Sequence, residues 1–127
     1  MGLDNIDVAA CAARGVAVYP ASGANDLAVA EYVITAALVL LRRAWFATGR
    51  VSAGEWPRTA LMGREIAGKR LGLVGYGSIA RVTARMARGL GMSIAGCDPL
   101  LPADHPAWTS VERQTLPDLL AGSDVVS

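Results

Sequence analysis

The feature that most constrains the fold is a glycine-rich turn between an apolar run and a helical segment. Residues 71–74 form the apolar run, and the turn after it reads Gly75-Tyr76-Gly77-Ser78-Ile79-Ala80, a G-x-G-x-x-A pattern. The helical segment ends at Gly91, a second apolar run occupies residues 93–97, and Asp98 follows it. A strand, a glycine turn, a helix, a strand and an acid within about thirty residues form the fingerprint of a dinucleotide-binding βαβ unit.

Each residue type in the turn has a physical reason to be there. Gly75 permits a tight turn in which a Cβ would clash, and Gly77 lets the backbone approach a pyrophosphate closely. The small side chain of Ala80 still allows close packing of helix on strand. The N–H groups of Gly77, Ser78 and Ile79 would point at the phosphates, aided by the positive end of the helix dipole.

Asp98 stands 23 residues after Gly75, at the end of the second expected strand. A carboxylate at this place accepts hydrogen bonds from the hydroxyls of an adenosine ribose. It also favours NAD over NADP, because a 2′-phosphate would meet a negative charge instead of an arginine. The alternative, an ordinary βαβ turn without a nucleotide, stays open on these residues alone.

The amino-acid composition indicates a globular protein and limits the kinds of partner that we expect. The chain has 127 residues, of which 53% are hydrophobic and 18% charged, as in a globular domain. A net charge of +1 gives no reason to expect a nucleic acid or an acidic membrane as partner. One histidine and two cysteines, Cys11 and Cys97, make no metal cluster, and the cysteines suit a reducing compartment. We expect a cytoplasmic protein, because the start lacks a signal-peptide pattern and residues 27–41, interrupted by Glu31, are too short for a bilayer span.

The first part of the chain predicts short elements followed by a boundary. Residues 7–14 read as a helix capped by Asp7 and ended by Gly15, and residues 16–19 alternate as a short strand would. Residues 20–25 form a loop that we interpret as a domain boundary or hinge.

A long apolar helix is expected from Asp26 to about Arg43, with Asn25 or Asp26 as its cap. One stripe of this helix is apolar, and three further apolar residues lie off the stripe. The stripe consists of Val29, Val33, Ala36, Ala37 and Leu40, and the other three are Leu38, Val39 and Leu41. Such a helix must be buried on most sides. A partner subunit would supply that burial, unless a larger single chain does so.

The remaining segments alternate between helices, loops and strands. Residues 42–53 predict a helical piece broken near Gly49 and Gly54, and an irregular connector runs from Trp56 to Lys69. The helix after the glycine turn has an apolar face (Ile79, Val82, Met86 and Leu90) and an arginine face that we interpret as solvated (Arg81, Arg85 and Arg88). Further on we expect a loop over residues 99–110, a strand over 111–114, a helix over 116–121 and a strand over 124–127. Thr115 would cap that helix, with Asp118 at the capping-box position.

These alternating elements predict an α/β fold with a Rossmann-type doubly wound parallel sheet. Such a fold has two mononucleotide-binding halves, and the sequence accounts for the first half only. We therefore expect this sequence to be part of a longer chain.

Taken in order, the motifs resemble the D-isomer-specific 2-hydroxyacid dehydrogenases, a family that includes phosphoglycerate, glycerate, D-lactate, formate and phosphite dehydrogenases. The matching segments are GLDNID at residues 2–7, ANDLAVAE at 24–31, GLVGYGSIA at 72–80, Cys97-Asp98-Pro99, and LPDLLAGSDVVS at 116–127, together with the spacing from Trp56 to the glycine turn. Two residues depart from the family pattern, since Ser78 replaces a frequent arginine and Ala80 the third glycine. Both lie where the backbone does the binding, so the resemblance is only slightly weakened.

The resemblance implies that residues 1–22 end a flavodoxin-like substrate domain and that residues 23–127 begin the NAD-binding domain. It implies NAD as cofactor, held by Gly75, Tyr76, Gly77, Ser78, Ile79, Asp98 and Pro99. Val29 would lie near the nicotinamide, and Asn25 would line the cleft near the substrate. The helix at residues 26–43 would form part of a homodimer interface.

The resemblance also implies which groups perform the chemistry. The family uses an arginine for the substrate carboxylate, a histidine as acid and base, and a glutamate that raises the pKa of the histidine, all beyond the DVVS segment. We therefore expect no catalytic residue in this sequence. His105, the single histidine, lies in a proline-rich loop beside the adenosine end, which is the wrong place for hydride transfer.

The function implied for the full-length protein is hydride transfer between NAD and a small D-2-hydroxy acid or 2-keto acid. A non-enzymatic NAD(H)-sensing regulator of the same fold is one alternative, and an inactive truncated chain is another. The presence of the arginine, glutamate and histidine would separate the enzyme from the regulator.

Overall fold

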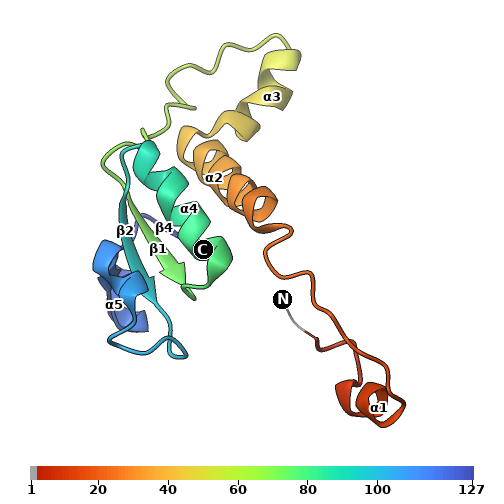
Figure 1. Cartoon of the computed structure of the whole chain (residues 1–127). Helices are drawn as coiled ribbons and strands as arrows, with labels where there is room; N and C mark the ends of the chain where they lie inside the picture. The colour runs from red at the N-terminus through yellow and green to blue at the C-terminus, as the bar shows by residue number, and fades with distance from the viewer. Residues whose placement is uncertain (1–2) are drawn as a thin grey trace.

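The described part of the chain, residues 3–127 of this computed structural model, is built on a four-stranded parallel sheet (Figure 1). Its strands are β1 (Arg70–Val74), β2 (Ser93–Cys97), β3 (Glu112–Arg113) and β4 (Val125–Val126), in the spatial order β3-β2-β1-β4. All neighbouring pairs are parallel. This is the order of the first four strands of a doubly wound sheet, which confirms the predicted α/β class. Gly2 of the GLDNID segment lies outside the described residues.

Helices cover both faces of the sheet. Helix α4 (Ser78–Gly89) carries the chain from β1 to β2, and α2 (Asp26–Arg42) packs against it. Helix α5 (Leu116–Gly122) lies on the opposite face. The core on the α4 side takes residues from every layer: Ile34, Leu71, Leu73, Ala84, Ala87 and Ile94.

On the other face, β1 and α5 approach so closely that only glycine fits between them. A Cβ at Gly72 would lie 2.6 Å from Cδ2 of Leu119 and would also collide with Ser123. Leu119 is fully buried there. The glycine in the middle of β1 is therefore a packing requirement, because any side chain would push α5 off the sheet.

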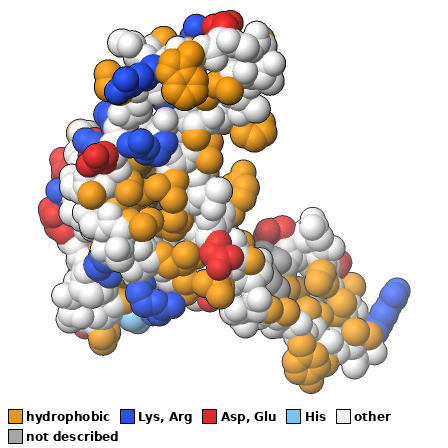
Figure 2. Space-filling model, turned by 90° about the horizontal axis from the view of Figure 1, so that it is seen from above, with side chains coloured by type: hydrophobic (Ala, Val, Ile, Leu, Met, Phe, Trp, Pro, Cys, Tyr) orange, Lys and Arg blue, Asp and Glu red, His pale blue; other side chains and the backbone are white. Residues whose placement is uncertain are grey.

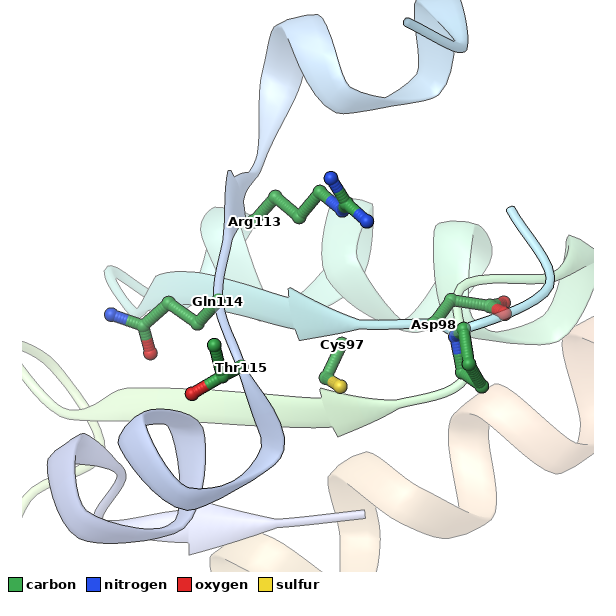
Figure 3. A pocket seen from close by; sticks show the side chains of 6 residues that line it. Cys97, Asp98, Arg113, Gln114 and Thr115 are labelled. Atoms are coloured by element: carbon green, nitrogen blue, oxygen red, sulfur yellow. The ribbon is translucent and has the colours of Figure 1, made fainter. Parts of the chain in front are cut away.

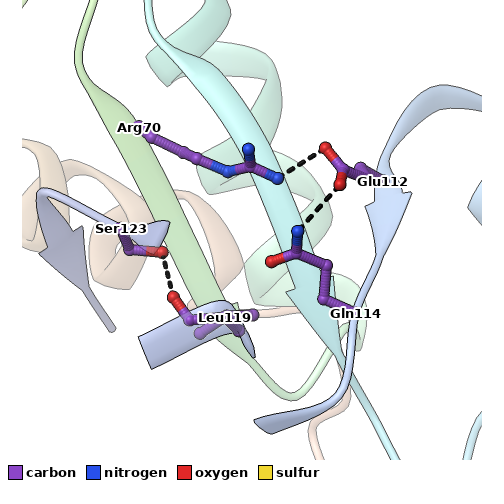
Figure 4. A network of polar contacts seen from close by, with 5 residues as sticks. All are labelled: Arg70, Glu112, Gln114, Leu119 and Ser123. Atoms are coloured by element: carbon purple, nitrogen blue, oxygen red, sulfur yellow. Dashed lines mark hydrogen bonds and ion pairs between the residues drawn. The ribbon is translucent and has the colours of Figure 1, made fainter. Parts of the chain in front are cut away.

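A polar network on the α5 face ties the edge strand to β1 (Figure 4). The Arg70 guanidinium donates to one carboxylate oxygen of Glu112, and Nε2 of Gln114 donates to the other at 2.7 Å. The hydroxyl of Ser123 donates to the carbonyl of Leu119 at 2.6 Å. The short strand β3 is thus held by side chains as well as by its backbone ladder.

The buried face of α2 differs from the predicted stripe. Its buried residues are Ala30, Ile34, Ala37 and Leu41, so only Ala37 of the predicted five is buried. The true stripe is displaced by about one residue, or roughly 100° around the helix. Position 25 is the N-cap as expected, yet the Asn25 side chain makes no capping hydrogen bond.

The most buried face of helix α4 lies beside the predicted one, of which Met86 still packs against the core. Thr83, Ala84 and Ala87 are buried, whereas Leu90 is 37% exposed. Small side chains face inward because α4 packs against both the sheet and α2, and bulky residues would hold these layers apart.

The N-terminal arm, residues 3–68, confirms some of the predicted elements and corrects two. Helix α1 (Val8–Ala13) is capped by Asp7, whose carboxylate accepts from the Ala10 N–H at 2.8 Å. Residues 16–19 form no strand, because no other segment among residues 3–127 pairs with them. Helix α3 (Ala44–Ser52) runs through Gly49 without a break and ends just before Gly54, which has a φ of +83°. None of the helices in the described part is long and apolar enough to cross a membrane.

The segments after β2 follow the expected order with one addition. The loop after Asp98 contains a short 3₁₀ helix, η1 (Pro106–Ser110). Thr115 caps α5, accepting from the Asp118 N–H at 3.4 Å and donating to the Asp118 carboxylate at 2.6 Å. The predicted cap residue is therefore confirmed.

Candidate functional site

The glycine turn leaves an open, uncapped helix N-terminus at the carboxyl end of β1. Gly75 has a φ of +89°, a conformation that side chains rarely tolerate, and its N–H donates to the carbonyl of Cys97 at 2.7 Å. No side chain caps α4 at Gly77, and a Cβ built on Gly77 meets no protein atom within 4 Å. The first amides of α4 thus face free space, the arrangement that binds a phosphate group.

Tyr76 contributes to this site through its backbone rather than its ring. The side chain is only 2% exposed and stacks on Trp108, with ring centroids 5.2 Å apart. Its N–H donates to the Asp98 carboxylate at 2.7 Å. Tyr76 therefore locks the turn to the end of β2.

Asp98 is held in place by three backbone N–H groups. One carboxylate oxygen accepts from Tyr76, and the other accepts from Leu100 at 2.9 Å and Leu101 at 3.2 Å. The Tyr76 hydrogen bond is the main cause that lowers the pKa of Asp98 below its ordinary value of 3.8. The group is therefore ionised at neutral pH. A carboxylate has about four lone-pair sites, so one acceptor site is left for an outside donor such as a ribose hydroxyl.

A cavity of about 490 Å³ opens beside this carboxylate at the carboxyl ends of β2 and β3 (Figure 3). It is lined by Cys97, Asp98, Pro99, Arg113, Gln114 and Thr115. Ligands of open parallel sheets bind at this end of the strands. The sequence analysis did not predict three of these lining residues: Arg113 in β3, and Gln114 and Thr115 directly after it. Only the pairing of β3 with β2 brings them beside Asp98.

A second, smaller hollow of about 210 Å³ joins the glycine turn to α2. Val29 of α2 lines it together with Gly75 and Ile79. The structure thus places Val29 beside the turn, whereas Asn25 lines neither of the two cavities.

The other candidate side chains have local structural partners. His105 accepts the Ala107 N–H on its Nδ1 at 3.0 Å and so caps η1. Arg81 donates to the carbonyl of Gly77 at 3.2 Å, and Arg88 donates to that of Ser110. These two exposed arginines therefore have backbone partners, which the solvated interpretation did not include. No cluster of three or more His, Cys, Asp or Glu side chains in residues 3–127 is placed to hold a metal.

Comparison with known proteins identifies the family. Residues 34–127 match the family described as D-isomer specific 2-hydroxyacid dehydrogenase, NAD binding domain. The chain belongs to this family. The open space at Gly77, the uncapped amides of α4 and the ionised Asp98 all fit its cofactor, NAD.

Individual relatives agree with this assignment. The chain is 55% identical over its whole length to the (S)-sulfolactate dehydrogenase of Chromohalobacter salexigens, of which it covers 41%. Among solved structures, the glyoxylate reductase from Paecilomyes thermophila superposes with a TM-score of 0.82 at 35% identity, over 98% of this chain and 38% of that one. The NAD-dependent formate dehydrogenase from Staphylococcus aureus, solved in complex with NAD, gives 0.81 at 25% identity, over 99% and 38%. The chain thus spans about two fifths of the length of these relatives.

Proposed function

We propose that the full-length protein is an NAD-dependent dehydrogenase that interconverts a small D-2-hydroxy acid and the corresponding 2-keto acid. The single observation that carries the proposal is the ionised Asp98, fixed by three backbone N–H groups beside an uncapped helix N-terminus. Bound NAD supplies the acceptor for the hydride that leaves C2 of the hydroxy acid, while the hydroxyl proton goes to a base. Membership of the NAD-binding family supports this reading.

In this proposal the described residues bind and orient the cofactor. The N–H groups of Gly77, Ser78 and Ile79 would hold the pyrophosphate, with Gly75 setting the turn. The free acceptor site of Asp98 would take a ribose hydroxyl. Pro99 would form part of the adenosine wall, since it lines the cavity beside Asp98.

The nicotinamide and substrate contacts extend the proposal toward α2. Val29 would touch the nicotinamide half, in keeping with the hollow that it shares with Gly75 and Ile79. Asn25, exposed at the start of α2, would face the substrate across a cleft between two domains. We assign no catalytic side chain within the described residues, and in this proposal the arginine, histidine and glutamate of the family mechanism would lie outside them.

We also propose a division into a substrate domain ending at residue 22 and an NAD-binding domain starting at residue 23. Helix α1 has no buried residue, and Figure 1 shows it away from the sheet at the end of an extended segment. An isolated helix without buried contacts is not stable in water, so it needs a surface to pack on. A substrate domain would supply that surface.

A homodimer through residues 26–43 is the third part of the proposal. On α2, Tyr32 is 74% exposed and Leu40 62% exposed, and both lie outside the buried stripe of the helix. Figure 2 shows patches of hydrophobic side chains exposed on the face of the molecule that is in view. A second copy would cover these side chains.

We also propose a cytoplasmic location. Both cysteines are free, which suits a reducing compartment.

The experiment uses the full-length protein, with calorimetric titration of NAD and an assay of NADH formation on a panel of 2-hydroxy acids. Sulfolactate is the first substrate to assay, because the 55% identical relative is named for it. Gly77→Val, which fills the phosphate space, should abolish NAD binding. Gly49→Ala, on an exposed part of α3, should not affect it. Nucleotide binding without turnover of any acid would favour the NAD(H)-sensing regulator. A failure to bind NAD would overturn the proposal.

A further inference from the structure

The cavity beside Asp98 contains a second charged side chain, that of Arg113. Arg113 pairs with Gly96 in the parallel ladder, one residue before Cys97, so β3 delivers it to the same sheet edge. Figure 3 shows Arg113 on one side of the strand end and Asp98 beyond it. The preference for NAD was expected because a 2′-phosphate would meet a carboxylate instead of an arginine. The structure places both groups in one cavity.

The Arg113 guanidinium has no anionic partner of its own. In the described part of the chain it takes part in none of the ion pairs. Its Cζ lies 5.7 Å from the ring centroid of Trp108, a cation–π contact that positions the head group without neutralising it. Trp108 is itself fixed, since it stacks on Tyr76 and donates its Nε1–H to the carbonyl of Pro102 at 2.9 Å.

The two charged side chains of the cavity therefore differ in how many hydrogen-bond partners they already have within the protein. Asp98 has three N–H partners, whereas Arg113 takes part in none of the side-chain hydrogen bonds or ion pairs found among residues 3–127. A guanidinium binds phosphate oxygens well, because its planar fork of donors matches them. NADP-binding sites of this fold use an arginine near the ribose for the 2′-phosphate.

We propose that Arg113 can bind the 2′-phosphate of NADP, and that the charge of Asp98 is the feature of this cavity that makes it prefer NAD. The proposal rests on the nucleotide site proposed above. It makes cofactor choice a balance between two residues of neighbouring strands, Asp98 after β2 and Arg113 in β3. Removing the carboxylate charge should then be enough to admit NADP.

The test measures the dissociation constants of NAD and NADP for the full-length protein by calorimetry, without any turnover. Asp98→Asn keeps an acceptor oxygen and removes the charge, and we expect it to bind NADP at least about tenfold more tightly than the wild type. The double variant Asp98→Asn/Arg113→Gln should lose that gain. The matched double variant Asp98→Asn/Arg85→Gln should keep it, because Arg85 is exposed on α4 and does not line the cavity.

Two results would overturn the proposal: no gain in Asp98→Asn, or a gain that survives Arg113→Gln. If Asp98→Asn does not fold, the single variant Arg113→Gln decides instead. It should raise the ratio of the NADP to the NAD dissociation constant several-fold while Arg85→Gln leaves it unchanged, and equal ratios refute the role of Arg113. A wild type that binds no nucleotide would instead refute the proposed function, and one that binds NAD but oxidises no acid would leave this test intact.

Discussion

The sheet unit, residues 70–127, and the N-terminal arm, residues 3–68, are both rich in apolar residues but bury them very differently. In the sheet unit Leu71, Ala95 and Leu119 are fully buried. In the arm neither α1 nor α3 has a buried residue, and Trp56 is 81% exposed. In the sheet unit, α4 and α5 cover the two faces of the sheet, and α2 of the arm packs against α4. The arm exposes surfaces that call for another domain or another subunit.

This difference in burial follows from how the secondary-structure elements are arranged in each region. In the sheet unit, strands and helices alternate over short distances, so each new element covers the face left by the previous one. In the arm, α2 reaches the core through one stripe, and Ile66 packs against the same core from the segment before β1. Mutations should therefore change folding stability in the sheet unit and association in the arm.

The largest expected effect is in the sheet unit, at Leu119. Leu119→Ala should lower the free energy of unfolding by about 2–5 kcal/mol, because it opens a cavity under β1. Leu120→Ala is the matched control, the same change on the same helix at a side chain that is 52% exposed. It should cost less than about 0.5 kcal/mol. Urea denaturation measures both, and equal costs would contradict the assignment of the α5 core.

A pair of glycines gives opposite signs in the two regions. Gly72→Ala should destabilise by about 1–3 kcal/mol, since its Cβ would lie 2.6 Å from Leu119 Cδ2. Gly49→Ala should stabilise by roughly 0.5–1 kcal/mol, because the site is helical and open. Thermal unfolding of both variants tests the contrast. A tolerated Gly72→Ala would show that α5 can move away from β1.

In the arm, Leu40→Glu should weaken self-association rather than folding. We expect at least about a tenfold weaker dimer, equivalent to roughly 1.4 kcal/mol, from a charge placed in the proposed interface. Leu120→Glu, at a similarly exposed leucine of α5, serves as control. Analytical ultracentrifugation across a concentration series gives the constants. A wild type that stays monomeric would remove the basis for the dimer, and an unfolded Leu40→Glu would mean that this face is buried by its own chain.

The smallest expected effect is the pH dependence of the Asp98 contribution. The folded-state pKa of Asp98 lies below its ordinary value of 3.8, mainly because of the Tyr76 hydrogen bond. The ionised group therefore stabilises the folded state above that value, and the contribution is lost as the pH falls through the folded-state pKa. The difference in thermal midpoint between wild type and Asp98→Asn should stay constant from neutral pH to about pH 5 and narrow below about pH 4. A constant difference down to pH 2.5 would show that the carboxylate charge contributes nothing to stability.

The sequence by itself determined the features that depend on near neighbours along the chain. The turn from Gly75 to Ala80, the bounding strands, the cap at Asp7 and the cap at Thr115 all follow from steric limits and hydrogen bonds within a few residues. The position of Asp98 could be read for the same reason, because a strand, a helix and a strand of standard length leave it at the edge of the sheet beside the turn.

Only the tertiary structure decided which faces meet. Periodicity shows that α2 has apolar residues on several sides, but the neighbours of Ala30 and Ile34 select the face that is buried. Residues 16–19 have the alternation of a strand and form none, because a strand requires a partner. Arg113 reaches the Asp98 cavity through the pairing of β3 with β2, a contact between segments that the sequence separates by a loop and a 3₁₀ helix. Local patterns set each element, whereas long-range packing and strand pairing decide which side chains share a site.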